Sequence, residues 1–307
     1  MLLHGFVNRE GDGLALYLAV RVATILARLV PLRLSYAVAR VAGVLAFYGW
    51  SGGRRRCIQN MTHVTGGDTE AARRHARRSF GNYVVYLVDF FRSLSLTPEG
   101  IEQRVVFDRE STWAALRAQR QGNGIVFITM HFGNWDLGAA LLSINAFPIS
   151  AIADSFANER VNRLVIGSRE HLGMKIIQAD RVGPGILRAL RGNDVVAMLI
   201  DVPQPEGGVQ VEFFGATIAV SDGPARIALR AGSSVVAATL PRLKPWGDQV
   251  GVDFRPVAFS PSGDAERDAH ALTQAVFTQL EQLVRRDPSQ WYIFRNLWPA
   301  DRAVTTA

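Results

Sequence analysis

A chain of 307 residues with 48% hydrophobic and 20% charged residues is long enough to bury a sizeable core, and this composition excludes the disordered and fibrous classes. The formal net charge of +7 comes largely from arginine, which suits phosphate-bearing partners such as nucleic acid, an anionic membrane face or a phosphorylated carrier. The single cysteine, Cys57, excludes an internal disulfide framework and a CxxC metal site, and it fits a reducing compartment.

The segment 13–50 is strongly apolar but is interrupted by four arginines, Arg21, Arg28, Arg33 and Arg40. No uncharged run of about 18 residues remains, so we expect no spanning helix. Pro31 divides the segment into two helices, and apolar faces opposite arginines are typical of helices that lie in the membrane plane. The alternative is a pair of core helices with exposed arginines. We expect residues 1–50 to form amphipathic membrane-associating helices and residues 51–307 to form a single domain, with no signal peptide at the start.

The next segments are basic. SGGRRR, directly after Trp50, predicts a glycine hinge followed by a cationic cluster. A helix is predicted over 68–95, with Asp68 as its N-cap and apolar residues at helical spacing. Four arginines on this helix form either a phosphate-facing patch or a solvated face: Arg73, Arg74, Arg77 and Arg78.

From about residue 105 the pattern becomes α/β. IVFIT (125–129) is a continuous apolar run of the kind found in buried parallel strands. Strands are also predicted at 149–154, 175–179, 195–200, 234–240 and 250–257, with 209–214 as an edge strand or hairpin arm. Helices are predicted over 157–172, 183–191 and 264–286, and between the capping pair Ser221–Asp222 and Gly232. This alternation favours one α/β domain with a mostly parallel sheet.

The sharpest motif is MHFGNWD, which follows the predicted strand 125–129 and opens a helix. Active sites of open α/β sheets lie at such carboxyl strand ends. His131 and Asp136 are five positions apart, about 140° around a regular helix. They can meet only if His131 lies in the turn and Asp136 in the first helical turn, which Gly133 and Asn134 permit.

This pair suits acid–base chemistry. A neutral imidazole can take the proton from a substrate hydroxyl, and a carboxylate on its other nitrogen fixes the tautomer and stabilises the imidazolium. The substrate hydroxyl would be the nucleophile, so no protein serine is needed. The alternative is a structural His131 with Asp136 as a helix cap. GxSxG, P-loop, GxGxxG and HExxH motifs are absent, and the other histidines show no metal-like grouping.

The HFGNWD block resembles the HxxxxD block of the bacterial lipid A biosynthesis (lauroyl/myristoyl) acyltransferase family, which includes the phosphatidylinositol mannoside acyltransferases. The resemblance covers roughly residues 15–300. Further blocks match in order, namely Arg169 and Gly173, then Gly183, Leu187 and Gly192, then Asp201, Phe213–Phe214–Gly215, Gly223–Pro224–Ala225, Leu229 and Gly232.

The resemblance implies a glycerophosphate-acyltransferase-like α/β/α domain, peripheral to the cytoplasmic face of the inner membrane. It implies His131 as base and Asp136 as its orienting partner, acyl-CoA or acyl-carrier protein as donor, a membrane glycolipid as acceptor, and no metal, bound cofactor or nucleic acid. Two segments depart from the family pattern, and they leave the acceptor open. VPQPEGGV follows Asp201, and QWYIFRNLW lacks the histidine–arginine pair of the lipid A enzymes.

We expect four further residues to contribute to substrate binding: Asp154, Arg169, Asp201 and Glu206. Asp154 ends a predicted strand fifteen residues before Arg169, so the two can form an ion pair that either anchors a phosphate or braces the fold. Pro205–Glu206–Gly207 resembles the PEG block of glycerol-phosphate acyltransferases, where the acidic residue shapes the acceptor site. The alternative there is a Pro/Gly turn with an exposed glutamate.

Two other functions stay open. A hydrolase, either an acyl thioesterase or a lysophospholipase, would use the same pair to activate water. A non-enzymatic basic binder of membranes or nucleic acid is the third hypothesis, which a buried strand leading into a His/Asp turn disfavours because electrostatic binding needs no such site.

Overall fold

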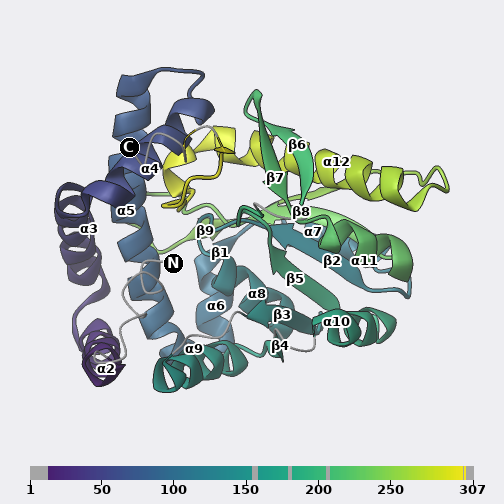
Figure 1. The fold of residues 1–307 in the computed structure, drawn as a ribbon. Coiled ribbons are helices and arrows are strands. Elements are labelled where there is room, and N and C mark those ends of the chain that lie inside the picture. The colour runs from purple at the N-terminus through teal and green to yellow at the C-terminus, as the bar shows by residue number, and fades with distance from the viewer. Residues whose placement is uncertain (1–12, 154–157, 179–181, 205–207, 300, 302–307) are drawn as a thin grey trace.

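The computed structural model describes residues 13–153, 158–178, 182–204, 208–299 and 301. A six-stranded sheet lies at the centre, in the order β10-β8-β2-β5-β3-β4 (Figure 1). All neighbouring strands are parallel except the antiparallel β10–β8 pair at one edge. The strands are β2 (Ile125–Thr129), β3 (Ile149–Ala153), β4 (Lys175–Gln178), β5 (Val195–Leu199), β8 (Ser234–Thr239) and β10 (Asp253–Pro256).

Helices cover both faces of this sheet, because its central strands are apolar on both sides. Val126 and Ile128 of β2 join one core cluster, while Ile125 joins the other. The first cluster includes side chains of α10 (Val182–Arg191), α11 (Gly223–Ala231) and α12 (Ala265–Arg286). The second includes side chains of α6 (Pro98–Arg104), α7 (Arg109–Gln119) and α8 (Trp135–Ile144), and α9 (Glu159–His171) packs beside β4. The predicted α/β class with a largely parallel sheet is confirmed.

The described part of the chain begins with α2 (Gly13–Leu29), α3 (Leu32–Gly49), α4 (Ser51–Val64) and α5 (Thr69–Arg92). The break at Pro31 and the N-cap at Asp68, which accepts from the Ala71 amide, are as predicted. α3 and α4 pack along α5, with α2 and α3 on its outer side (Figure 1). None of the helices in the described ranges has the length and apolarity needed to cross a membrane.

The predicted glycine hinge after Trp50 is wrong, since residues 51–64 form α4. Tertiary packing outweighs the low helix propensity of glycine here. A Cβ on Gly53 would lie 2.3 Å from the Trp50 ring, so only glycine lets the indole lie against the helix. Arg56, in the predicted basic cluster, donates to the Phe294 carbonyl (2.9 Å).

Among the described residues, two small sheets and two short 3-10 helices complete the fold. β6 (Val209–Phe213) and β7 (Ala216–Val220) form a hairpin, so 209–214 is a hairpin arm. The predicted strand 250–257 is split because β9 (Val250–Gly251) pairs with β1 (Val105–Val106), whereas the following residues pair with β8 as β10. The 3-10 helices are η1 (Ser93–Ser95) and η3 (Pro288–Gln290).

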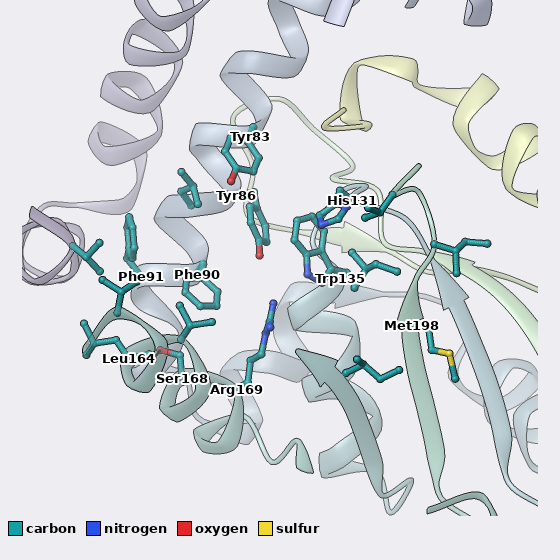
Figure 2. Close-up of a pocket in the computed structure, with 18 of the residues that line it drawn as sticks. Tyr83, Tyr86, Phe90, Phe91, His131, Trp135, Leu164, Ser168, Arg169 and Met198 are labelled. Atoms are coloured by element: carbon teal, nitrogen blue, oxygen red, sulfur yellow. Dashed lines mark hydrogen bonds between the residues drawn. The ribbon is translucent and has the colours of Figure 1, made fainter. Parts of the chain in front are cut away.

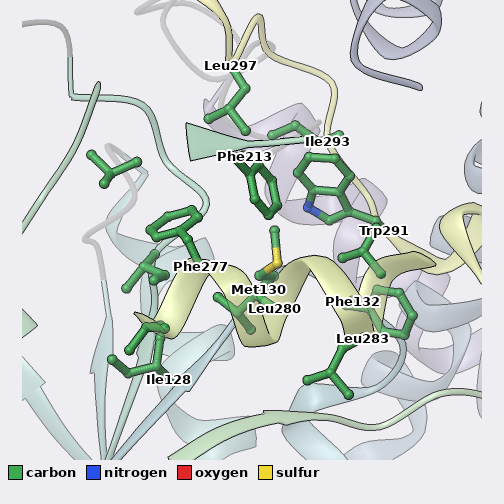
Figure 3. Packing of buried hydrophobic residues seen from close by; sticks show 14 of the residues in the cluster. Ile128, Met130, Phe132, Phe213, Phe277, Leu280, Leu283, Trp291, Ile293 and Leu297 are labelled. Atoms are coloured by element: carbon green, nitrogen blue, oxygen red, sulfur yellow. The ribbon is translucent and has the colours of Figure 1, made fainter. Parts of the chain in front are cut away.

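The segment after η3 runs through the core. Figure 3 shows Trp291, Ile293 and Leu297 meeting Phe213 of the hairpin above α12. The Trp291 and Phe213 rings meet edge to face, with centroids 5.8 Å apart. Trp291 is fully buried, so this aromatic contact fixes the C-terminal segment against the β6–β7 hairpin.

We predict that the α3–α5 crossing depends on Gly43 and not on Gly81. A Cβ on Gly43 would lie 2.5 Å from the Cα of Gly81, whereas a Cβ on Gly81 would meet nothing nearer than 3.9 Å. Both changes to alanine gain the same helix propensity, about 1 kcal/mol. Gly43→Ala should nevertheless lower the free energy of unfolding by about 1–3 kcal/mol relative to Gly81→Ala, because the helices must separate. Urea unfolding of both variants measures this, and equal stabilities would contradict it.

Candidate active site

His131 lies in the turn between β2 and α8, and this turn is held from two sides. The Asn134 amide donates to the Leu240 carbonyl (2.9 Å), and the Gly133 amide donates to the Gln290 carbonyl (3.0 Å). Gly133 has φ +60°, and a Cβ there would lie 1.9 Å from the Leu240 carbonyl oxygen, so the close approach requires glycine. The Asn134 side chain caps α8 by accepting from the Leu137 amide.

The partner of the His131 ring is Asp201. β2 and β5 are parallel neighbours with Thr129 opposite Leu199, and His131 and Asp201 each follow two residues later. His131 Nδ1 lies 2.8 Å from Asp201 Oδ1, and the His131 amide donates to Oδ2 (3.0 Å). The indole N–H of Trp291 also donates to Oδ2 (3.0 Å). The buried carboxylate therefore holds both the backbone and the ring of the histidine.

This pairing sets the proton positions. Burial alone would raise the pKa of Asp201, but His131 and the hydrogen bonds from its ring, its amide and Trp291 hold that pKa below its usual value. Because an ionised carboxylate only accepts hydrogen bonds, Nδ1 of His131 carries the hydrogen and Nε2 keeps its lone pair. No described residue hydrogen-bonds Nε2, and the half-buried ring lines a cavity. The imidazole is therefore arranged to accept a proton there.

Asp136 does not pair with His131, and the prediction of that pair is wrong. Its carboxylate accepts from Nε of Arg169 (2.8 Å) and from the Tyr86 hydroxyl (2.6 Å). Asp136 lies in the first turn of α8, where its side chain faces α5 and α9. Burial alone would lower the pKa of Arg169, but Asp136 and Tyr86 raise it above its usual value. Asp136 thus ties the helix after the histidine turn to two other helices.

A third buried carboxylate, that of Asp89, supports the same turn. Asp89 of α5 accepts from Asn134 (3.2 Å), Tyr36 (2.5 Å) and Arg104 (2.6 Å), and it also pairs with Arg242. Burial alone would raise the pKa of Asp89, but the two guanidinium groups and the Tyr36 hydroxyl hold it below its usual value. The carboxylate stays ionised, and through Asn134 it fixes the start of α8.

The cavity in front of His131 has a volume of about 610 Å³. Figure 2 shows Phe90 and Phe91 of α5 and Leu164 of α9 facing it, with His131 and Trp135 at the sheet end. The Trp135 ring meets the His131 ring edge to face (5.3 Å between centroids). The lining near α2, α5 and α9 is mainly apolar, whereas the loops after β5 and β7 contribute Gln204 and Ser221. This shape suits a substrate with an alkyl chain and a polar part.

Of the four residues predicted to bind substrate, the structure describes Arg169 and Asp201. Arg169 lines the cavity, and its partner among the described residues is Asp136. Asp201 is buried behind His131 and does not line the cavity, so its predicted contact with substrate is replaced by contact with the histidine. Asp154 and Glu206 lie outside the described residues. The described ranges hold no cluster of three or more His, Cys, Asp or Glu side chains that could bind a metal.

Sequence reasoning missed three residues that support the turn carrying His131 and the start of α8, namely Trp291, Tyr86 and Asp89. Tyr86 and Asp89 lie three residues apart on the predicted helix 68–95, so they share one face of that helix. An acidic side chain beside an aromatic one on this face was the signal in the sequence that could have indicated a buried polar contact. Trp291 opens the aromatic segment WYIFRNLW, whose density of large side chains predicts burial but not a partner.

Comparison with known proteins gives consistent matches. The sequence model of the bacterial lipid A biosynthesis acyltransferases matches residues 12–300. A phosphatidylinositol mannoside acyltransferase of Mycolicibacterium smegmatis is 28% identical over 259 residues, 82% of this chain and 81% of the relative. A protein of the same name from Mycobacterium tuberculosis is 27% identical over 268 residues, covering 83% of this chain and 80% of the relative.

We predict that substitutions of Asp201 and Asp136 have different effects. Asp201→Asn keeps the shape of the side chain but removes the charge that stabilises the His131 imidazolium, so the rate of the acyl transfer expected from the sequence should fall about 10²–10⁴-fold. Asp136→Asn leaves Arg169 without its carboxylate, which should lower the free energy of unfolding by about 3–5 kcal/mol, with a smaller loss of rate in the protein that remains folded. Initial rates and thermal melts of both variants test this. If the Asp136→Asn enzyme were inactive with an unchanged melting temperature, and the Asp201→Asn enzyme were active, Asp136 would be the partner of His131, as the sequence predicted.

Proposed function

The chain belongs to the bacterial lipid A biosynthesis acyltransferase family, and from its site we propose that it transfers a fatty acyl group from acyl-CoA or acyl-carrier protein to a hydroxyl of a membrane glycolipid. The observation that carries this proposal is the His131–Asp201 pair in the wall of a largely apolar cavity. The histidine supplies a base, and the cavity suits an acyl chain.

In the proposed reaction, His131 Nε2 takes the proton from the acceptor hydroxyl as its oxygen attacks the thioester carbonyl carbon. The tetrahedral intermediate collapses, the carbon–sulfur bond breaks, and the imidazolium returns the proton to the leaving thiolate. The products are an acyl ester and a free thiol. Asp201 stays ionised throughout and stabilises the imidazolium through Nδ1. No protein nucleophile is needed.

For the acceptor, the relatives provide the best support. Two proteins named phosphatidylinositol mannoside acyltransferases are similar to this chain over more than four fifths of its length. We therefore propose a mannosylated phosphatidylinositol, or a glycolipid of closely related structure, as the acceptor.

We also propose that α2 and α3 hold the enzyme on an anionic membrane at the cytoplasmic face of the inner membrane. The side of α3 facing α5 is buried, yet its other side exposes a continuous apolar stripe, Leu34, Val38, Val41, Leu45 and Tyr48. Residues 13–67 contain seven arginines and no acidic residue. A large exposed apolar stripe is unusual on a surface that stays in water, and the arginines complement anionic lipid headgroups.

The central prediction concerns His131. His131→Ala should lower transfer from acyl-CoA to phosphatidylinositol mannoside in vesicles by about 10²–10⁴-fold, because it removes the base. The control is His171→Ala, which truncates an exposed histidine at the end of α9 and should retain wild-type rates. Acylated lipid and released thiol are measured together. Fatty acid release at the same rate with and without acceptor would identify a hydrolase instead.

The membrane prediction uses surface substitutions that leave the core intact. Val41→Gln with Leu45→Gln places two polar side chains on the exposed stripe, at positions 61% and 67% exposed. Sedimentation with vesicles rich in anionic lipid should show clearly weaker binding, and added salt should weaken binding of the wild type because arginine contacts are screened. Val106→Gln, at an exposed apolar position away from α2 and α3, is the control. Unchanged binding of the double variant would contradict the assignment.

A further inference from the structure

Arg295 is a half-buried cation that has no partner among the residues that the structure describes. Its side chain lines the reaction cavity and makes no hydrogen bond or ion pair with any described residue. All other arginines in the described ranges that are buried or half-buried donate to an acceptor. Four of them bind carboxylates: Arg104, Arg169, Arg226 and Arg242. Six bind carbonyl or amide oxygens, namely Arg40, Arg54, Arg56, Arg92, Arg120 and Arg255.

The backbone that carries Arg295 is fixed relative to the catalytic histidine. The Tyr292 amide donates to the His131 carbonyl (2.7 Å), and Trp291 binds Asp201. On the other side, the Asn60 side chain donates to the Arg295 carbonyl (2.7 Å). The guanidinium therefore extends from a rigid support, which reduces the entropy lost when it binds a ligand.

The other arginines of the cavity are differently placed. Arg169 is paired with Asp136, so a carboxylate already offsets its charge. Arg21 and Arg28 are exposed on α2, beside the apolar part of the lining. Arg295 comes from the segment that follows η3, and the cavity that it lines also has the neutral polar residues Gln204 and Ser221 in its wall. A guanidinium that no described carboxylate neutralises is suited to bind an anionic oxygen group.

We propose that Arg295 binds a phosphate group of a substrate while the reacting atoms lie at His131. This inference rests on the proposed acyl transfer, in which both substrates carry phosphate: the donor in its pantetheine arm, the acceptor in its phosphodiester. Arginine binds phosphate by paired, charge-assisted hydrogen bonds that lysine cannot reproduce. Arg295 would thus hold the phosphate of one substrate while the acyl or lipid chain of that substrate occupies the apolar part of the cavity.

The kinetic test compares substrates with and without phosphate in the Arg295→Gln and Arg295→Lys enzymes. Donors are acyl-CoA and the acyl thioester of N-acetylcysteamine; acceptors are phosphatidylinositol mannoside and a neutral glycosyl diacylglycerol. Arg295→Gln should lower kcat/KM about 10–100-fold for the phosphate-bearing member of one pair and leave its phosphate-free counterpart nearly unchanged. Arg295→Lys should recover only part of the loss. The affected pair identifies donor or acceptor. Arg230→Gln, an exposed arginine of α11, is the control.

A binding measurement makes the inference independent of turnover. Calorimetric titrations of wild type and Arg295→Gln with coenzyme A and with glycerophosphoinositol should show weaker binding of one of these probes by the variant. Equal affinities for both probes, or kinetic losses of the same size with and without phosphate, would overturn the assignment of Arg295. A wild type that binds a probe through Arg295 but transfers no acyl group would instead refute the proposed function alone.

Discussion

The Asp201 carboxylate is the point on which the site depends, because it accepts hydrogen bonds from three groups while it is shielded from water. Two come from His131, its ring and its amide, and the third comes from the Trp291 indole. A buried carboxylate without such donors would take up a proton and lose its effect on the imidazole. The donors arrive from β2 and from the C-terminal segment, so the histidine is oriented only when the β2–β5 register and the packing of Trp291 against Phe213 are both in place.

Two further buried carboxylates hold the same turn from the other side. Asp136 joins α8 to Arg169 and Tyr86, and Asp89 joins Asn134 to two arginines. Each is paired with cations, which offsets the cost of removing a charge from water. None of these cations contacts His131 in the described structure. The histidine and the aspartate of one short motif thus serve two purposes here: the histidine faces the cavity, and the aspartate anchors the helix that follows it.

Local patterns predicted most elements, and they failed where partners come from distant segments. The apolar runs at 125–129 and 195–200 predicted β2 and β5, and both His131 and Asp201 were placed in the site. Their pairing was missed because β3 and β4 lie between β2 and β5 in the sequence, and the order of strands in a sheet is not visible in apolar periodicity. The prediction of a glycine hinge at residues 51–53, which are part of helix α4, failed for a similar reason. Glycine propensity is local, whereas the contact of Gly53 with Trp50 is set by tertiary packing.

The placement of α2 links membrane attachment to the site under the proposed function. One side of the helix exposes Leu18, Val22 and Leu29, whereas Val20 and Thr24 line the cavity. α2 is held to the body of the protein by Arg92, which donates to the Val30 carbonyl (3.1 Å) just after the helix, and by Arg160, which lies over the Tyr17 ring. The helix proposed to lie in the bilayer is therefore also a wall of the reaction cavity. A lipid acceptor could then pass from the membrane to His131 along α2 while most of its apolar chain stays out of water, which avoids the cost of exposing it.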